Sequence, residues 1–490
     1  MVKVDTHRVN QVAFIAILSY FFLSFYQTPY IAGDPVWSNV IGQWIFAHHA
    51  IPTHDHWAWT AVGQAWTPQE WLFEVLLYEV NHLLGFRGVI IMMTLVSTFT
   101  WVVLADLLRL QGKSYPTGWA LLAALISTPW DQIRAEVFSY LFFALVLWIV
   151  EKATKKPKTL LWLLPLELIW VNTHGSFELG IGVVLWLGLV ALVPSFDWDW
   201  LQHAQLKSVG WSRIYAAAGM ALVSLLNPQG PHLYGFAYWL SFQSGVAKYI
   251  LEWQPATITE GFTFILAAEF AVFVLIRLQQ KESVRLSSLF WALGTFYMFL
   301  KAVRFGSYLL ITTPWALTPD ATFKLGWTWL AEKTKPVRGM RTTFVLGVAI
   351  GLTLLSVVAV IKTHGTLYQN AATSVNPKAV QVVAQIEEAH PSWRVWNGYN
   401  IGDALEAEGV PVSVDGRTEV YLANGIMKKY RDTMMAYPDA LAILNKERVR
   451  IAVMQSGAPL AGLLSIAPGW SAVYKAQGFS IYEKAGGGTA

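Results

Sequence analysis

Residues 33–79 hold most of the clustered acidic and histidine side chains of this chain. Asp34 opens the stretch, directly before Pro35 and an apolar segment with helical spacing. A carboxylate can accept a proton in general base chemistry, so Asp34 is the first residue of this stretch that could take part in catalysis. An aspartate before proline is also a common helix cap, which is the alternative interpretation.

Asp55, Glu70 and His49 are candidate substrate-binding residues of the same stretch. Asp55 lies in a turn-like HDHW segment and either binds an acceptor or closes the turn. Glu70 follows Thr67 by three residues, which is also the spacing of a capping box. The densest group of candidate metal ligands is Asp55 with four histidines: His48, His49, His54 and His56. They lack a specific metal spacing, so a solvated loop is the alternative.

Asn172 and His174 form a polar pair in the segment VNTHGSF, which follows an apolar run. Polar and ionisable residues within membrane segments usually face a cavity, so both are candidate substrate-binding residues. The alternative is that they satisfy exposed backbone groups at a helix end.

Phosphate binding requires cations, which are scarce at the predicted outer ends of the apolar segments. Arg134, Lys301 and Arg304 are the exceptions, and an arginine can hold a phosphate with two hydrogen bonds. Snorkelling towards lipid headgroups is the competing interpretation. The long outer loop 227–261 adds Glu252 and Trp253 to a candidate acceptor groove.

The composition is that of a polytopic α-helical membrane protein. Hydrophobic residues make up 55% of the 490 positions and charged residues 13%, and the mean hydropathy is +0.42. Basic residues lie in short loops and the net charge is only +4, so nothing indicates nucleic-acid binding. The absence of cysteine excludes disulfides and cysteine-ligated metal sites.

About twenty apolar residues are needed for each membrane crossing, which gives about eleven predicted spans. They lie near residues 10–31, 86–109, 115–130, 135–151, 158–172, 177–194, 212–227, 262–279, 286–302, 304–319 and 342–362. Lysine and arginine gather in alternate loops, which places the amino terminus inside and the carboxyl terminus outside. Residues 33–85 are therefore the first external loop of a transmembrane domain, residues 1–370. The first apolar segment lacks a small-residue cleavage site and is predicted to be a retained anchor.

Residues 371–490 have ordinary polarity and are predicted to form a small external water-soluble domain. Alternating helical and strand-like runs favour a three-layer α/β arrangement with a mostly parallel sheet. Strands are expected at 394–397, 410–414, 450–455 and in a hairpin over 471–483, and helices at 380–389, 401–408, 426–435, 438–444 and 460–466. No phosphate-binding glycine motif is present, so the domain is predicted to recognise an acceptor or to act as a structural cap.

The order of these features resembles the GT-C superfamily of membrane glycosyltransferases. The segments GDPVWSNVIGQWIFAHHAIPTHDHWAWTAVGQAWTPQEWL, WVNTHGSFELG and VDGRTEVY resemble a bacterial GT-C-like subgroup more closely. The resemblance implies transfer of a sugar from a polyprenyl-phosphate donor to a glycan, lipid or protein acceptor outside the cytoplasm. It also implies that Asp34 is the base or the ligand of a divalent metal ion. Pro35 stands where many members have a second acidic residue, which argues against the metal.

We therefore expect a GT-C-type enzyme in the bacterial cytoplasmic membrane, surrounded by membrane lipid and with no certain cofactor. The alternative is a non-catalytic GT-C-like subunit that binds a partner protein through its external domain. A transporter or lipid flippase ranks third, because neither paired charges at mid-membrane nor an internal repeat stands out.

Overall fold

The computed structural model describes residues 6–26, 33–198, 201–257, 261–280, 283–319 and 375–485. Its backbone contacts divide the chain into two compact units. The helical unit comprises residues 1–26, 90–230 and 250–363, and the mixed unit comprises residues 27–89, 231–249 and 364–490. This division differs from the boundary predicted near residue 370, because the first external loop packs with the carboxyl-terminal region.

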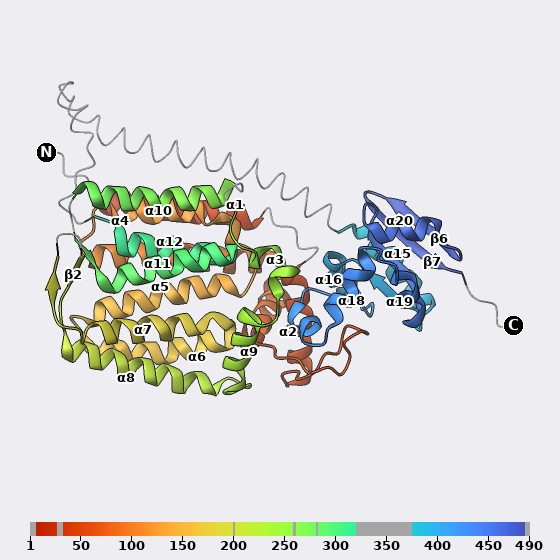
Figure 1. The fold of residues 1–490 in the computed structure, drawn as a ribbon, viewed down its shortest axis with the longest axis horizontal. Helices are drawn as coiled ribbons and strands as arrows, with labels where there is room; N and C mark the ends of the chain where they lie inside the picture. Colours follow the sequence, from red (N-terminus) through yellow and green to blue (C-terminus); the bar gives the residue numbers. More distant parts are fainter. Residues whose placement is uncertain are drawn as a thin grey trace, which may run out of the picture. The chain divides into compact units, whose positions relative to one another are not determined.

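The helical unit is built from helices that lie side by side (Figure 1). They are α1 (Thr6–Tyr26), α4 (Pro116–Ile126), α5 (Glu136–Ala153), α6 (Leu163–Thr173), α7 (Glu178–Val190), α8 (Lys207–Val223), α10 (Gly261–Gln280), α11 (Leu286–Lys301) and α12 (Gly306–Leu317). Short 3-10 helices lie between them: η1 (Thr128–Trp130), η2 (Pro157–Trp162), η3 (Gly175–Phe177), η4 (Ser224–Leu226), η6 (Leu251–Trp253) and η7 (Val303–Phe305). A small sheet joins β1 (Phe196–Asp197), β2 (Leu201–His203) and β3 (Val284–Arg285).

Helices occupy ten of the eleven predicted spans, and the eleventh, near 342–362, lies outside the described residues. Two stretches of the described chain are long and apolar enough to cross a membrane, Trp71–Leu110 and Lys207–Leu226. The first is α3, which contributes to both units and is interrupted at Gly85, where φ is 67°. Several other helices are shorter, and α4 with its 11 residues is about 16 Å long, half of a hydrocarbon core. The predicted count of about eleven spans is therefore not reproduced.

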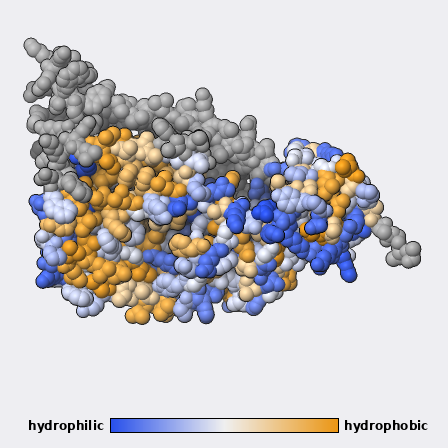
Figure 2. All heavy atoms as spheres, in the orientation of Figure 1, coloured by the Kyte–Doolittle hydropathy of each residue, from blue (hydrophilic) through white to orange (hydrophobic). Residues whose placement is uncertain are grey.

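Hydrophobic side chains gather on the surface of the helical unit, whereas the surface over the carboxyl-terminal strands and helices is mostly hydrophilic (Figure 2). Inside the helical unit, α7 and α8 approach closely because two glycines face each other. A Cβ added at Gly188 would lie 3.0 Å from the carbonyl oxygen of Gly210. Small residues at such contacts are typical of helices that pack within a membrane.

The mixed unit combines the first external loop with the carboxyl-terminal region. Its helices are α2 (Asp34–His48), α9 (His232–Phe242), α15 (Pro377–Ala389), α16 (Tyr399–Ala407), α17 (Thr418–Ala423), α18 (Ile426–Met434), α19 (Ala440–Lys446) and α20 (Pro459–Ile466), with the 3-10 helix η5 (Val246–Lys248). Its strands are β4 (Arg394–Asn397), β5 (Val449–Gln455), β6 (Trp470–Ala476) and β7 (Phe479–Lys484). The α/β class predicted for this region is confirmed, and α17 is a helix that the pattern did not predict.

The sheet has the order β4-β5-β7-β6. β4 and β5 are parallel, whereas β5 with β7 and β6 with β7 are antiparallel. The predicted mostly parallel sheet is therefore wrong. The final hairpin supplies two neighbouring antiparallel strands, because a short turn between consecutive strands reverses the chain.

The strand predicted at 410–414 is also wrong, although its alternate valines are buried as a strand pattern requires. Val412 forms an isolated bridge with Ala58 of the first loop, and the Trp59 N–H donates to the Val412 carbonyl at 2.9 Å. The Asn397 side chain takes the place of a ladder partner and accepts from the Ser413 N–H at 2.7 Å. The backbone groups of this strand-like segment thus find their hydrogen-bond partners in the first loop and in a side chain, and not in a neighbouring strand.

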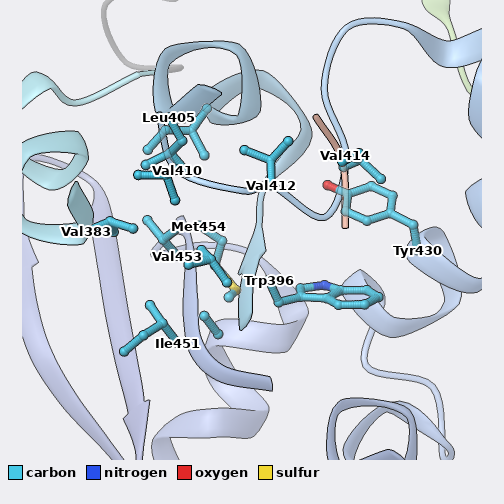
Figure 3. Packing of buried hydrophobic residues seen from close by; sticks show 14 of the residues in the cluster. Val383, Trp396, Leu405, Val410, Val412, Val414, Tyr430, Ile451, Val453 and Met454 are labelled. Carbon is cyan, nitrogen blue, oxygen red and sulfur yellow. The ribbon is translucent and has the colours of Figure 1, made fainter. Parts of the chain in front are cut away.

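One hydrophobic core holds the mixed unit together. Figure 3 shows Leu405, Val410 and Val453 grouped on one side and the Trp396 ring extending towards Tyr430, with which it makes a ring contact. The same core includes residues of the first loop: Trp37, Ile41, Ile45, Ala58, Ala61 and Trp66. Burial of each large apolar side chain contributes about 1.5–3 kcal/mol. The loop and the carboxyl-terminal region are therefore stabilised by the same buried surface.

Gly402→Ala tests the close packing of α16. A Cβ at position 402 would lie 2.1 Å from the Val414 carbonyl oxygen and 2.8 Å from Asn397 Nδ2. Because backbone must move to admit it, we expect a loss of about 1–3 kcal/mol of stability, measured as a lower thermal unfolding midpoint of the full chain. Gly462→Ala is the matched control, since nothing lies within 4 Å of its Cβ position. An equal midpoint for the two variants would contradict the packing.

Candidate active site

Asp34 is the first residue of α2 and follows Gly33, whose φ of 83° favours glycine. Pro35 lies in the first turn, where its missing N–H has no intrahelical partner to lose. The cap position of α2 is occupied by Gly33, which has no side chain to cap the helix. The predicted capping role of Asp34 is therefore wrong. The Asp34 carboxylate instead accepts a hydrogen bond from Trp37 Nε1 at 3.3 Å.

Asp403 of α16 holds the backbone next to Asp34. The Gly33 N–H donates to Asp403 Oδ2 at 3.1 Å, and the Gly416 N–H donates to Asp403 Oδ1 at 2.7 Å. A Cβ at Gly416 would lie 2.6 Å from the Trp37 indole, so Trp37 packs directly on this backbone. The orientation of Asp34 therefore depends on α16 and on the VDGR segment of the carboxyl-terminal region.

Arg417 is fully buried and pairs with two aspartates from distant parts of the chain. Its Nη1 lies 2.6 Å from Asp55 Oδ2, and its Nε donates to Asp415 Oδ1 at 3.0 Å. The rings of Trp57 and Trp66 face the guanidinium, with centroids at 4.7 and 5.1 Å. Such stacking suits the planar, weakly hydrated cation of arginine. We call Asp55, Asp415 and Arg417 the buried ion triad.

Asp55 also closes its turn, because its Oδ1 accepts hydrogen bonds from the N–H groups of Trp57 and Ala58 at 3.0 and 2.9 Å. The turn-closing interpretation is therefore confirmed. The carboxylate is buried against Arg417, which leaves the acceptor-binding interpretation without geometric support.

Burial favours the neutral form of the carboxyl groups around the ion triad. Burial alone would raise the pKa of Asp415, but the Arg417 charge and the hydrogen bonds from Arg417 and Tyr421 together hold this pKa below its ordinary value. Burial raises the pKa of Glu406 well above its ordinary value, and the Asp415 charge raises it further. The pKa of Asp403 is raised for the same two reasons. The buried Glu406 side chain therefore favours its protonated, neutral form.

The histidines of the first loop lie in separate aromatic contacts. Trp44 stacks between His48 and His56, with ring centroids at 4.2 and 5.0 Å. His49 ends α2 with a φ of 50° and contacts Phe46. The described residues contain no group of three or more His, Cys, Asp or Glu side chains that could hold a metal ion. The interpretation of these histidines as a metal cluster is therefore not supported.

Glu70 lies directly before α3, which begins at Trp71 and not near Thr67 as predicted. It therefore does not occupy the third helical position that a capping box requires. Its carbonyl oxygen accepts the Glu74 N–H at 3.0 Å, which opens the first turn of the helix.

In the helical unit, four predicted residues converge with Glu136 in what we call the charged cluster. Arg304 Nη2 donates to Glu136 Oε2 at 2.9 Å, and its Nη1 lies 3.5 Å from Glu252 Oε1. Arg134 Nη1 pairs with Glu252 Oε2. The Arg304 guanidinium lies 4.4 Å from the centroid of the Trp253 ring. The cluster joins η6, η7, the start of α5 and the segment before it.

His174 lies between α6 and η3, where its charge environment includes Arg304 and Glu252. Its Nδ1 accepts the Ser176 N–H at 3.2 Å and lies 3.1 Å from Ser139 Oγ. Ser176 Oγ lies 2.8 Å from the hydroxyl of Tyr308. His174 thus caps η3 and also connects the helix ends to the charged cluster.

Asn172 and Lys301 have other contacts. Asn172 donates to the Leu168 carbonyl at 2.8 Å and accepts from Asn227 at 3.2 Å, as its helix-end interpretation predicts. Lys301 is exposed, and its ammonium lies 5.6 Å from the centroid of the Tyr297 ring. A role in binding stays a prediction for both.

Five charged residues of these networks were not among the predicted candidates: Glu136, Asp403, Glu406, Asp415 and Arg417. Arg417 lies in VDGRTEVY, one of the segments that carry the family resemblance. A charged residue between Val414 and Tyr421 was the signal that could have marked Arg417 as a candidate. Glu136 opens an apolar helix and Asp403 lies on an amphipathic one, so neither position differs in pattern from an ordinary surface carboxylate.

The helical unit and the mixed unit together have counterparts among solved structures. Solved structures of an oligosaccharyltransferase from Archaeoglobus fulgidus are similar to this chain at 11% sequence identity. The form tethered to an acceptor peptide has a TM-score of 0.58 and covers 91% of this chain and 69% of that chain. The AglB complex with an inhibitory peptide and a dolichol-phosphate has a TM-score of 0.57 with the same coverage. The complex with Zn and sulfate has a TM-score of 0.51 and covers 91% and 68%.

The chain therefore has the fold of the GT-C superfamily of glycosyltransferases, and the predicted resemblance is confirmed. Its structural neighbours are membrane proteins, which agrees with the predicted membrane location. No protein-family model matches the sequence, and no curated protein matches it significantly.

Arg417→Met tests the buried ion triad. Removal of the cation leaves two buried aspartates unpaired, so we expect a loss of about 3–5 kcal/mol, measured as the thermal unfolding midpoint of the full chain. Lys428→Met is the control, because Lys428 pairs with Asp432 at 3.7 Å and is 74% exposed. That surface pair is expected to contribute less than about 1 kcal/mol. Similar losses in both variants would show that Arg417 has no special structural role.

Glu406→Gln tests whether the Glu406 side chain is protonated in the folded chain. The raised pKa of Glu406 means that its contribution to stability is complete below its ordinary value of 4.5 and is lost as pH rises through the folded-state value. Glutamine keeps the donor without titrating. We expect the unfolding midpoint of the variant, relative to the unmodified chain, to rise between pH 4.5 and pH 8.

The exposed neighbour Glu408 provides the control for this series. Glu408→Gln is expected to change the midpoint equally little at every pH. A pH-independent difference for Glu406→Gln would rule out a proton bound at this position.

Proposed function

We propose that this protein transfers a sugar from a polyprenyl-phosphate-linked donor to an acceptor at the outer face of the membrane. The observation that carries the proposal is the shared fold with AglB, whose structures include an acceptor peptide and a dolichol-phosphate. The acidic residue that opens the first loop supplies a second line of support. The acceptor is a glycan, a lipid or a protein.

Asp34 is the proposed catalytic base. Its carboxylate takes the proton of the acceptor hydroxyl while the hydroxyl oxygen forms a bond to the anomeric carbon. The bond between that carbon and the phosphate oxygen breaks, and the phosphate leaves with the electron pair. The hydrogen bond from Trp37 Nε1 orients the carboxylate, and Asp403 holds the backbone beside it. A well-oriented base is worth about 100-fold or more in rate.

The charged cluster is the proposed site for the donor phosphate. Arg134 and Arg304 present guanidinium groups to one point, which suits two oxygens of a phosphate. Lys301 adds positive charge on the same predicted outer side, and Trp253 offers an aromatic surface of the kind that packs against sugar rings. Acceptor contacts are proposed for the remaining candidates other than the buried Asp55: Asn172, His174, Glu252, His49 and Glu70.

A divalent metal ion is not part of the proposed chemistry. The Asp34 carboxylate accepts from Trp37, and Asp55 is paired with Arg417. No third acidic or histidine ligand joins either of them among the described residues. The donor set does not fit a metal, although one AglB structure is a complex with Zn and sulfate.

The proposed topology follows the distribution of positive charge. The chain crosses the bacterial cytoplasmic membrane about eleven times, with the amino terminus inside and both the first loop and the carboxyl-terminal region outside. The hydrophobic surface of the helical unit supports a membrane location (Figure 2). In this arrangement the carboxyl-terminal region is also free to bind a partner protein.

Asp34→Asn tests the base. Purified full-length protein in detergent is given polyprenyl-phosphate sugars and hydroxyl acceptors, and transfer is followed with radiolabelled sugar. We expect turnover to fall about 100-fold or more, because asparagine cannot accept the proton. Asp106→Asn is the control, since Asp106 pairs with Arg109 at 3.7 Å and is 47% exposed.

Full turnover in Asp34→Asn would refute the assignment of the base. If the unmodified protein transfers no sugar from any donor, the non-catalytic subunit that binds a partner protein becomes the preferred function.

A further inference from the structure

One carboxylate lies between the two arginines that the proposed function assigns to phosphate. Glu252 Oε2 pairs with Arg134 Nη1, and Glu252 Oε1 lies 3.5 Å from Arg304 Nη1. The side chains of Arg134 and Glu252 are 28% and 31% exposed, so an anion can approach them from solvent. The arginines therefore already hold an anion, and that anion belongs to the protein.

A phosphodiester resembles this carboxylate in charge and shape. Both groups carry one negative charge and present two equivalent oxygens to a guanidinium fork. The charged cluster has two cations and two anions, Arg134, Arg304, Glu136 and Glu252. Exchange of Glu252 for a singly charged phosphodiester leaves the cluster neutral, and a buried cluster is far more stable when its charges balance.

The rest of the cluster stays in position when Glu252 leaves. Arg304 keeps its hydrogen bond to Glu136 at 2.9 Å and its contact with the Trp253 ring at 4.4 Å. The backbone after Glu252 is also held, because Val303 N donates to the Gln254 carbonyl at 3.1 Å. Rotation of one side chain is thus sufficient to vacate the site, and no loop has to unfold.

We propose that Glu252 is an internal competitor that occupies the phosphate site of the charged cluster until the phosphate of an isoprenoid lipid displaces it. This inference rests on the proposed function, in which Arg134 and Arg304 hold the donor phosphate. Displacement frees Glu252 next to the bound phosphate and couples donor binding to a change in the candidate acceptor groove. An empty site keeps its arginines paired and does not bind other anions tightly.

Protonation does not open the site near neutral pH. Burial alone would raise the pKa of Glu252, but Arg134 and Arg304 outweigh it and lower this pKa to about 2. The carboxylate therefore stays charged wherever a bacterial membrane protein works, and competition by another anion is the remaining way to displace it.

Glu252→Gln tests the competition by direct binding. Farnesyl phosphate is titrated into the full-length protein in detergent micelles at about pH 5, where this monoester carries one negative charge as a phosphodiester does, and the Kd is measured by calorimetry. A site that is blocked most of the time binds with an affinity reduced by the open fraction, so removal of the competitor is expected to lower Kd about tenfold or more. Glu252→Asp, which keeps the charge on a shorter side chain, is expected to show a smaller gain.

Glu136→Gln is the matched control, because it removes the same charge from the same cluster but leaves Glu252 on Arg134. We expect a smaller gain in affinity for this variant than for Glu252→Gln, because Glu252 still occupies the site. An equal gain in Glu136→Gln and Glu252→Gln would show that net charge alone governs binding, and would overturn the competitor. Thermal unfolding midpoints confirm that each variant is folded.

Two further ligands separate the lipid from its phosphate. Farnesol is expected not to gain affinity in Glu252→Gln, and a gain would overturn a phosphate site. Inorganic phosphate is expected to bind more weakly than farnesyl phosphate in every variant. Equal affinity would overturn the lipid as the displacing group.

The outcomes also distinguish this inference from the function on which it rests. If Glu252→Gln binds farnesyl phosphate as the unmodified chain does, and Arg304→Gln abolishes binding, the competitor is refuted while the phosphate site stands. If neither the unmodified chain nor Glu252→Gln binds farnesyl phosphate, the phosphate site is refuted together with its competitor.

Discussion

The buried ion triad is the constraint on which the mixed unit depends. A guanidinium that is 0% exposed must have anionic partners, because an unpaired buried charge costs several kcal/mol. Asp415 supplies one partner from the adjacent sequence, and Asp55 supplies the other from the first external loop. Separation of the loop from the carboxyl-terminal region would leave the buried Arg417 without its Asp55 partner. This interaction, together with the shared hydrophobic core, explains why segments at opposite ends of the chain form one compact unit.

The position of Asp34 is a consequence of that arrangement. Asp403 accepts hydrogen bonds from Gly33 and from Gly416, so the start of α2 and the segment before Arg417 are joined by one carboxylate. The carboxyl-terminal region is therefore more than a cap or an acceptor-recognition module. Its Asp403 accepts hydrogen bonds from the backbone beside the candidate base and from the backbone beside Arg417.

The helical unit follows the same rule of balanced charge with different residues. Two arginines and two glutamates neutralise one another where apolar helices end: Arg134, Arg304, Glu136 and Glu252. His174 and the serine hydroxyl that it contacts lie beside them. Charged residues in an apolar helical unit are costly unless they are paired, so such groups mark functional positions. In the proposed function the pairing itself matters, because a donor phosphate would have to displace the Glu252 carboxylate.

Much of the candidate site in the helical unit could be predicted one residue at a time. Arg134, His174, Glu252, Trp253 and Arg304 are polar groups that interrupt an apolar chain, and the structure brings them together. Their partners could not be predicted in the same way. Glu136 resembles any acidic residue in the first turn of a helix, and nothing local indicates that it pairs with Arg304.

Local pattern alone determined where the apolar helices lie, that the carboxyl-terminal region is α/β, and which stretch carries the acidic and histidine residues. Hydrophobicity and periodicity are properties of neighbouring residues, so they can be read without a fold. Tertiary structure decided the direction of the β5–β7 pairing, the loss of the 410–414 strand to a loop contact, and the roles of Asp55 and Glu252. Each of these depends on a partner far away in the chain, and only the folded chain brings the two together.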